Sequence, residues 1–448
     1  MRLHFPGKLG DTKVSFVNDF KQSLVPMKPC NFEEKVIWYS ILGTYGFYFT
    51  GLLYYIPPAI AWILTIYLIR KLWLQKDNSS INNRITIPWE VWVWIVSMAA
   101  IEFATIFGHA DFNLGTASLI KATIGWAKGW ALFALFPLIG CLNIRPKLLC
   151  RAVCLLCLQS LIILSFCYVA SLLRLNISYT APLNFFGGPK LAFSITLYTV
   201  QDSWLRIALF APWATIIGFV GNVFLPLSLL ETKQRLRWIG IITSLLMCWF
   251  SGSRANMLAL PTAWIATQIL ANSQRPFLWL TAGFSSLITG LFAPNLINAM
   301  RSFQNWMRSL RKNSNSEREA LDRIAIRRWA EAPITGHGVT DSGPSRIVGV
   351  NIGTHNNWTG LLFINGIIGV LALGVSLTCS FISLVIRAQE SQIAKSALHI
   401  LLIIFCNTFV DSLNMTAYLV APGLVFLGTA FREPLGKQER RLFVPSST

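Results

Sequence analysis

The chain has 448 residues, of which 54% are hydrophobic and 13% are charged. Soluble domains usually have about 25% charged residues, so this composition excludes an ordinary soluble enzyme and favours one helical membrane domain. The net charge of +19 is typical of nucleic-acid-binding proteins as well. Most of the basic residues lie in short loops, where anionic lipid headgroups account for them, so we reject a nucleic-acid partner and expect membrane lipids instead.

The first 35 residues mix lysines with acidic residues and lack the basic tip, apolar stretch and cleavage site of a signal peptide. We therefore predict that residues 1–35 form a cytoplasmic segment and that the first apolar helix directs insertion. Most of the nine cysteines lie in apolar runs, which indicates buried small side chains rather than a disulfide framework or a zinc site.

A helix needs about 20 mostly apolar residues to cross a bilayer, and residues 36–431 contain about twelve candidate segments. The first run, Val36–Ile69, is long enough for two crossings, with Gly51 and Pro57-Pro58 as places for a break. The other predicted segments are Pro88–His109, Thr116–Leu142, Leu148–Leu173, Pro212–Leu230, Trp238–Phe250, Ala255–Ala271, Pro276–Ile297, Trp358–Ile386, Ala397–Phe409 and Met415–Phe431. The predicted fold class is an all-α polytopic integral membrane protein.

Lysine and arginine in short loops predict the orientation, because such loops stay in the cytoplasm. Alternate turns, among them residues 145–151 and 233–237, are basic, so both termini are predicted to be cytoplasmic, including the tail at 432–448. Two longer loops, 174–211 and 298–357, are then periplasmic. The second has an excess of arginine, which indicates either a solvated, partly helical loop or a loop that meets an anion.

An ordered set of residues lies at the end of the second long loop. Residues 327–338 read Arg-Arg-Trp-Ala-Glu-Ala-Pro-Ile-Thr-Gly-His-Gly, and residues 353–358 read Gly-Thr-His-Asn-Asn-Trp. This order resembles the superfamily of O-antigen ligases and O-antigen polymerases, which has an Arg, a Pro-x-x-Gly-x-Gly turn, a His-Asn pair at the head of a helix and a Gly-x-x-Gly inside it. The matching residues are Pro333, Gly336, Gly338, His355, Asn356, Gly366 and Gly369.

Two further matches lie upstream. Residues 251–254, Ser-Gly-Ser-Arg, resemble the Ser-x-Ser-Arg turn of the superfamily, and Arg206 resembles the arginine of its earlier outer loop. The second match departs from the pattern, because Gly218 misses the ten-residue spacing by one residue. Arg327 and Gly338 have the Arg-x10-Gly spacing described in polymerases.

The resemblance implies an inner-membrane glycosyltransferase that polymerises or ligates polyprenyl-pyrophosphate-linked glycan repeats on the periplasmic face. Its products would be O-antigen, capsule or exopolysaccharide. The donor would be an undecaprenyl-pyrophosphate-linked oligosaccharide, and the acceptor a glycan or the lipid A core of lipopolysaccharide. No cofactor is expected, and no metal, since metal-site motifs such as His-Glu-x-x-His are missing from the sequence.

The residue types fit this chemistry. Guanidinium groups form bidentate, charge-assisted bonds with phosphate oxygens, so Arg206, Arg254 and Arg327 are predicted to hold the pyrophosphate and stabilise it as it leaves. A neutral His355 is predicted to act as general base on the acceptor hydroxyl or to orient the acceptor. Asn356, Gly336 and Gly338 are predicted to support this site.

Each assignment has an alternative. Arg254 can extend to the outer headgroups, Arg206 can be an ordinary loop residue, and His355 can cap a helix together with Asn356. Arg327 and Arg328 can both lie on a solvated helix face, and the sequence does not tell which of them turns inward.

Three other sets of polar residues carry expectations. Glu102 is expected to pair with Lys121 or Lys128, His337 is expected at the surface, and Asp411 can bind acceptor sugar or cap a helix. The rival function is a lipid-linked oligosaccharide flippase or another polysaccharide-export transporter. The chain lacks the two related halves that transporters often have.

Overall fold

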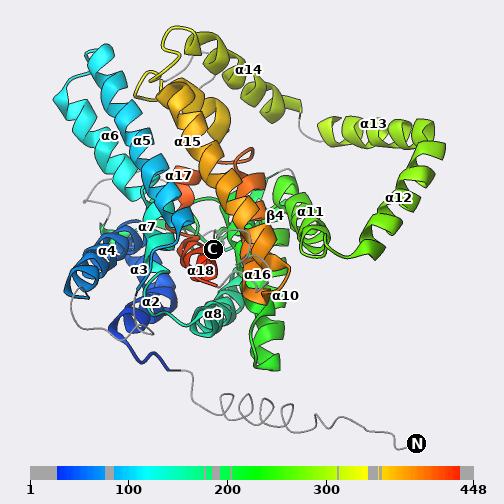
Figure 1. Cartoon of the computed structure of the whole chain (residues 1–448), viewed down its shortest axis with the longest axis horizontal. Helices are drawn as coiled ribbons and strands as arrows, with labels where there is room; N and C mark the ends of the chain where they lie inside the picture. The colour runs from blue at the N-terminus through cyan, green and yellow to red at the C-terminus, as the bar shows by residue number, and fades with distance from the viewer. Residues whose placement is uncertain are drawn as a thin grey trace, which may run out of the picture.

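The computed structural model describes residues 28–75, 85–175, 178–183, 192–201, 204–309, 312–341, 352 and 356–433. These residues form a bundle of helices with two short β-hairpins (Figure 1). The predicted helical membrane fold is confirmed at this level. The predicted segment 1–35 and tail 432–448 lie largely outside the described residues, as does His355.

The first apolar run is divided into three helices, α2 (Phe32–Leu42), α3 (Thr44–Thr50) and α4 (Ile56–Leu74). Gly51 ends α3 with a φ of 87°, a left-handed conformation that glycine adopts without steric cost. Pro57 lies in the first turn of α4, where proline fits because the backbone N–H there has no helical partner. The break therefore falls at the residues that the sequence indicated.

The next helices are α5 (Trp89–Asp111), α6 (Thr116–Lys128), α7 (Leu132–Ile139) and α8 (Pro146–Leu172). The predicted segment Thr116–Leu142 is thus broken between α6 and α7 at Gly129, where a Cβ atom would lie 2.7 Å from the carbonyl oxygen of Asn414. Every residue of α7 is buried, whereas α6 has no buried residue. Helix α6 therefore lies on the outside of the bundle.

The first long loop folds into two antiparallel hairpins. Strand β1 (Ser178–Thr180) pairs with β2 (Ser194–Thr196), and β3 (Thr199–Gln201) pairs with β4 (Trp204–Arg206). Val200 lies opposite Leu205 in the second hairpin. This pairing brings Arg206, at the end of β4, to the start of the next helix.

Six helices follow, α9 (Ala214–Leu229), α10 (Gln234–Phe250), α11 (Arg254–Leu270), α12 (Pro276–Leu291), α13 (Ala293–Ser309) and α14 (Lys312–Trp329). Helices α12 and α13 extend away from the bundle and are bent by 77° relative to each other (Figure 1). The predicted segment Pro276–Ile297 runs across this bend.

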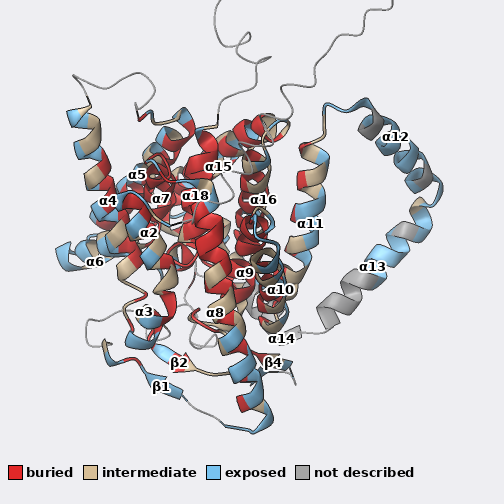
Figure 2. Cartoon of the chain, turned by 90° about the horizontal axis from the view of Figure 1, so that it is seen from below, coloured by how far each residue is buried: buried red, intermediate tan, exposed pale blue. Residues whose placement is uncertain are grey.

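The last helices are α15 (Asn357–Ala388), α16 (Gln392–Asn407), α17 (Leu413–Thr416) and α18 (Ala421–Phe431). Helix α15 is kinked at Gly366, which has φ 62° and ψ −157°. Helix segments coloured as buried run through the centre of the bundle (Figure 2). Phe133 of α7, Phe219 of α9 and Phe426 of α18 are almost fully buried.

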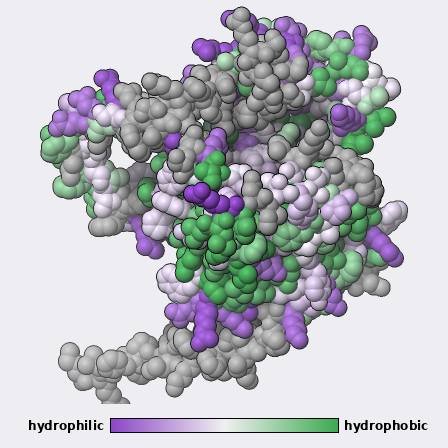
Figure 3. Space-filling model, turned by 180° about the vertical axis from the view of Figure 1, so that it is seen from behind, coloured by the Kyte–Doolittle hydropathy of each residue, from purple (hydrophilic) through white to green (hydrophobic). Residues whose placement is uncertain are grey.

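Among the described residues five spans are long and apolar enough to cross a membrane: α4, α5, α8, α15 and the stretch Thr116–Ile139 formed by α6 and α7 together. The bent pair α12–α13 makes six. Helices α9, α16 and α18 are shorter apolar helices. The count of twelve crossings is therefore not confirmed, although each predicted segment coincides with helix. Figure 3 shows a broad hydrophobic patch on one face of the molecule, with hydrophilic residues gathered above and below it.

The two ends of the bundle differ. One end, which we call the loop end, carries β1, β2, β4 and α14 (Figure 2). The other, the ion-pair end, holds four salt bridges between elements: Arg387 with Glu90 at 2.8 Å, Arg151 with Glu231 at 2.5 Å, Arg145 with Glu34 at 2.7 Å and Lys71 with Glu33 at 2.9 Å. Since removing one member of a buried pair leaves an uncompensated charge, these contacts fix the helix ends there.

Candidate functional site

A cavity of about 620 Å³ lies at the loop end. Its walls come from α6, from the turn after α14, from the first turns of α15 and from the segment that precedes α17. The lining residues used below are Lys121, Lys128, Gly338, Asn357, Asn365 and Ser412. Gly338, a predicted supporting residue, thus lines this cavity. The cavity lies beside the head of α15, which begins two positions after the predicted catalytic residue His355.

The glycine motif joins a turn to the kink of α15. Gly336, Gly338 and Gly366 have φ angles of 69°, 74° and 62°, which side chains disfavour. A Cβ on Gly366 would lie 2.8 Å from the backbone nitrogen of Gly336. The sequence match therefore reflects a tight fit between the turn 333–338 and α15.

Backbone hydrogen bonds complete this junction. The N–H groups of His337 and Gly338 donate to the carbonyls of Phe363 and Ile364, at 2.9 and 2.8 Å. In return, the N–H of Ile367 donates to the carbonyl of Pro333 at 3.0 Å. The turn thus satisfies backbone groups that α15 leaves unpaired at its kink.

His337 is buried, so the expectation of a surface histidine is wrong. Its ring stacks between those of Phe112 and Phe363, with centroid distances of 4.9 and 4.4 Å. Its Nδ1 lies 3.1 Å from the carbonyl oxygen of Phe363, and its Nε2 lies 3.1 Å from Glu331. Phe112 directly follows α5 and Phe363 lies in α15, so the burial arises from packing between elements that are distant in sequence.

The two arginines at the end of α14 face different ways. Arg328 forms an ion pair with Asp341, and its guanidinium lies 5.3 Å from the centroid of the Phe363 ring. Arg327, the predicted pyrophosphate ligand, is exposed. Helix α14 also packs on α15 through Leu321. Arg328 therefore anchors α14, and Arg327 points to the outside.

Arg206 and the Ser-Gly-Ser-Arg turn form one unit. Arg206 is 7% exposed, and its Nη2 lies 3.5 Å from the carbonyl oxygen of Gly252. Gly252 has a φ of 59°, and a Cβ there would lie 2.8 Å from Nε of Arg206. Ser253 caps α11 by accepting from the N–H of Asn256, and Arg254 is half-buried at the first position of α11.

Arg206 carries a buried charge without an acidic partner among the described residues. Its Nε has no hydrogen-bond acceptor there, and no salt bridge of the described chain includes it. Burial of an unpaired guanidinium is costly. Arg206 is therefore not an ordinary exposed loop residue, and its surroundings suit an anionic ligand.

A hydrogen-bond network links this unit to the head of α15. Asn256 donates to the carbonyl of Thr215 at 2.8 Å, and the hydroxyl of Thr215 donates to the carboxylate of Asp411 at 3.2 Å. The amide of Asn357 donates to the carbonyl of Asp411 at 2.6 Å. Asp411 thus links α9 to the head of α15. The sequence alone suggested two other roles for it, as a helix cap or as a ligand of the acceptor sugar.

The predicted supporting residue Asn356 begins α15. Its side chain accepts a hydrogen bond of 3.0 Å from the N–H of Trp358, the N-cap arrangement that asparagine favours. His355 precedes Asn356 directly but lies outside the described residues. The residues that surround the cavity nevertheless include its chain neighbours Asn357 and Gly360.

The prediction that Glu102 pairs with Lys121 or Lys128 is wrong, because the described residues contain no such ion pair. Glu102 is 9% exposed, and neither of its carboxylate oxygens has a hydrogen-bond partner there. Lys128 instead lies over the rings of Tyr54 and Tyr55, at 5.3 and 4.7 Å. Lys121 is exposed at the cavity wall. The spacing of the two lysines was visible in the sequence, but the cavity beside them was not.

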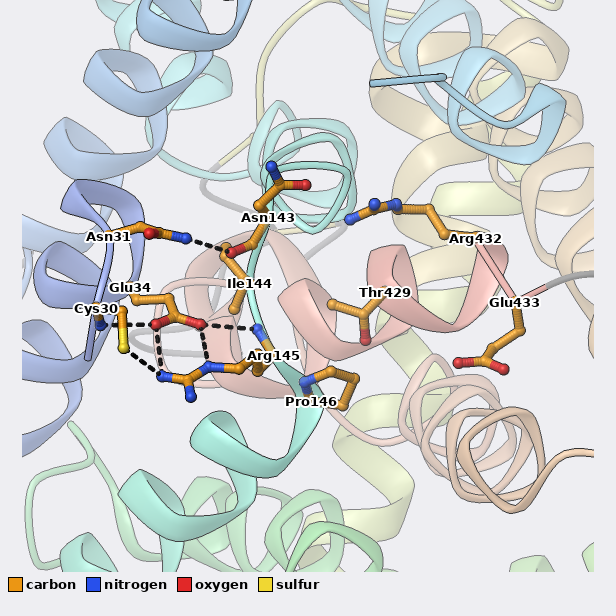
Figure 4. A pocket seen from close by; sticks show the side chains of 10 residues that line it. All are labelled: Cys30, Asn31, Glu34, Asn143, Ile144, Arg145, Pro146, Thr429, Arg432 and Glu433. Carbon is orange, nitrogen blue, oxygen red and sulfur yellow. Dashed lines mark hydrogen bonds and ion pairs between the residues drawn. The ribbon is translucent and has the colours of Figure 1, made fainter. Parts of the chain in front are cut away.

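A second pocket, of about 560 Å³, lies at the ion-pair end (Figure 4). Its main polar contact is between the carboxylate of Glu34 and the guanidinium of Arg145, with nitrogen–oxygen distances of 2.7 and 2.8 Å. Because the most prominent charges of this pocket neutralise each other, we do not assign it to substrate.

Residues 239–374 match the family model described as O-antigen ligase. This region therefore carries the O-antigen ligase domain of the O-antigen ligase and polymerase superfamily. The matched region includes the Ser-Gly-Ser-Arg turn, α14, the glycine turn and the head of α15, whereas Arg206 and α6 lie outside it. No curated protein matches the chain.

The O-antigen ligase match over residues 239–374, together with the apolar helices, indicates a multi-pass bacterial inner-membrane protein and a glycosyltransferase-like enzyme. Such proteins use lipid-linked glycan donors and glycan acceptors. The matched region includes the Arg254 turn and part of the cavity wall, namely the turn after α14 and the first turns of α15. The family relationship therefore concerns the candidate site itself.

Proposed function

We propose that the protein transfers glycan repeats from a polyprenyl-pyrophosphate carrier to an acceptor hydroxyl at the periplasmic face, in the synthesis of O-antigen, capsule or exopolysaccharide. The observation that carries this proposal is Arg206, a buried arginine without an acidic partner among the described residues, seated on the Ser251–Arg254 turn. A pyrophosphate is the anion that such a pair of arginines binds well.

In this mechanism the acceptor hydroxyl attacks the anomeric carbon of the donor sugar. The bond from that carbon to the phosphate oxygen breaks, and its electron pair leaves with the polyprenyl pyrophosphate. His355 takes the proton of the hydroxyl. Arg206 and Arg254 stabilise the charge that grows on the leaving group, and the exposed Arg327 contacts the donor from α14.

The proposed topology places the loop end in the periplasm, with the loops 174–211 and 298–357 outside and both 1–35 and 432–448 in the cytoplasm. Helix α14 and the β-hairpins lie at the same end of the bundle (Figure 2), which supports this arrangement. Membrane-impermeant labelling of single cysteines in a cysteine-free background tests it. A cysteine at Val200 should label from outside, and one at Gln392 should not.

Glycan transfer by the purified protein in detergent tests the function. Undecaprenyl-pyrophosphate-linked repeats should give longer lipid-linked chains, or a product on a separately added acceptor. The variants His355→Ala and Arg254→Ala should lose at least about 100-fold in rate, the scale of losing a general base or a charge-stabilising donor.

The control is Arg275→Ala, which removes an exposed arginine between α11 and α12 and should keep wild-type activity. We expect chelation of metal ions to leave the rate unchanged, since the proposed charges come from side chains. Absence of transfer with every donor, in protein that remains folded, would favour the transport function instead.

A further inference from the structure

Helix α6 presents an uncompensated positive charge to the cavity. Lys121 and Lys128 are two helical turns apart, so they lie on one face, and both line the cavity. Among the described residues neither has a carboxylate within salt-bridge distance, and the nearby Glu102 makes no hydrogen bond. The tyrosine rings below Lys128 hold its ammonium group in place. The wall is therefore suited to an anion.

An apolar groove of about 390 Å³ lies next to this cavity. It lies between α4, α5 and α7, and Trp126 lines both the groove and the cavity. The groove follows α4 from Trp62 to Leu72, which is the direction of the ion-pair end. Trp62 and Trp126 are fixed by hydrogen bonds to the carbonyls of Ala127 and Met98, at 3.1 and 2.9 Å. The cationic cavity and the apolar groove thus lie on either side of Trp126.

This lysine site is distinct from the arginine unit. Neither Arg206 nor Arg254 lines the cavity, and the network through Thr215 and Asp411 separates them from it. Asn357, at the head of α15, belongs to both: it lines the cavity and bonds to Asp411. The head of α15 therefore has one cationic site on each side.

We propose that the lysine cavity and its groove form the acceptor site, and that the acceptor is a second prenyl-pyrophosphate-linked glycan. Lys121 and Lys128 bind its pyrophosphate, the groove binds its single prenyl chain, and its glycan reaches the head of α15. The inference rests on the proposed function and makes the enzyme a polymerase. A lipid A acceptor has several acyl chains, which one narrow groove between three helices does not accommodate.

The first test is independent of activity. Native mass spectrometry of the full-length protein with undecaprenyl pyrophosphate should show two lipids bound per chain. Lys121→Gln/Lys128→Gln should leave one, and Arg206→Gln/Arg254→Gln should also leave one. One lipid on the wild-type protein, or two on the lysine variant, would overturn the proposal even if glycan transfer is observed.

The second test fills the groove. Ala99 is exposed on α5 and lines the groove, so Ala99→Trp should block the prenyl chain without disturbing the core. Val96 is also exposed on α5 but does not line the groove, which makes Val96→Trp the matched control. With a long-chain donor and a single-repeat acceptor, the KM for the acceptor should rise about tenfold or more in Ala99→Trp only.

The two failures are distinguishable. If the wild-type protein transfers no glycan, the proposed function fails. If it transfers glycan but Ala99→Trp and the lysine variant keep the wild-type KM for the acceptor, only the acceptor site fails. Efficient transfer to a lipid A-type acceptor that the lysine variant does not weaken would assign the protein to the ligases and overturn the inference.

Discussion

The side chain of Asn357 donates to the carbonyl oxygen of Asp411 across 2.6 Å, and its own carbonyl oxygen accepts from the N–H of Leu413 at 2.9 Å. The same amide also donates to the carbonyl of Thr408 at 2.9 Å. One buried asparagine thus joins the head of α15 to the whole segment between α16 and α17. It is the element that connects the two cationic sites.

Asn357→Ala should therefore destabilise the protein. The change leaves buried backbone groups of Asp411 and Leu413 without partners, at a cost of about 2–3 kcal/mol. Thermal unfolding in detergent measures this, and glycan transfer should fall in the same variant. Gln392, exposed at the start of α16, supplies the control Gln392→Ala, which should melt like wild type. Equal melting of the two variants would contradict the bridging role.

Gly366→Ala should be strongly destabilising, whereas Gly374→Ala in the same helix should not. Gly366 has backbone angles open essentially only to glycine, so alanine costs about 2 kcal/mol or more there. At Gly374 a Cβ meets only ordinary contacts, at 3.8 Å or beyond, and alanine is the better helix former. Comparing the two melting temperatures tests the positive φ at Gly366, and equal stability of the two variants would contradict it.

Replacing each of two buried glutamates of α5 by glutamine should have opposite effects on stability. Glu90 pairs with Arg387 at 2.8 Å, so Glu90→Gln should cost about 3 kcal/mol by leaving the arginine uncompensated. Glu102 has no partner among the described residues, so Glu102→Gln should be neutral or stabilising, because it removes an unpaired buried carboxylate. Unfolding of the two variants at neutral pH provides the measurement. A large loss in Glu102→Gln would reveal a partner for this side chain.

The contact between Glu331 and His337 should make stability depend on pH. The hydrogen bond from His337 lowers the pKa of the Glu331 carboxyl; slight burial opposes this, and the charge of Arg328 reinforces it. A carboxyl whose pKa is lowered in the folded state stabilises the protein above its unfolded pKa of about 4.3. That contribution is lost as the pH falls through the folded value.

The difference in melting temperature between wild type and Glu331→Gln should therefore shrink as the pH falls below about 4. Asp341 also contacts Arg328, so Asp341→Asn serves as a comparison for the effect of the arginine. A difference that grows on acidification would contradict the assigned direction.

The sequence predicted much of the local structure. Apolar runs indicated the positions of the helices. Gly51 and Pro57 indicated the break before α4, because each of these two residues acts through its own backbone geometry. The ordered glycines and the Ser-Gly-Ser-Arg turn predicted the superfamily that the family model confirms. The joining of Arg206 to that turn followed only from the structure, since it depends on a hairpin.

What the sequence did not predict depends on contacts between distant elements. His337 is buried because Phe112, at the end of α5, and Phe363 of α15 meet around it. Arg327 and Arg328 are neighbours in one helical turn, and only the packing of α14 on α15 separates their directions. The break at Gly129 depends on the backbone of Asn414, almost three hundred positions away in the chain. The predicted partner for Glu102 was incorrect because the spacing within each helix does not define which side chains meet between α5 and α6.

The kink of α15 also bears on how this site can change during evolution. Since the first turns of α15 exchange backbone hydrogen bonds with the turn 333–338, they belong mechanically to that turn rather than to the rest of the helix. The segment 333–366 could therefore be exchanged as one unit between related proteins, with Gly366 as the point where the exchanged segment ends. Exchanging this segment between related transferases would carry the head of α15 as an intact unit, while the helix beyond the kink remains adapted to its own bundle.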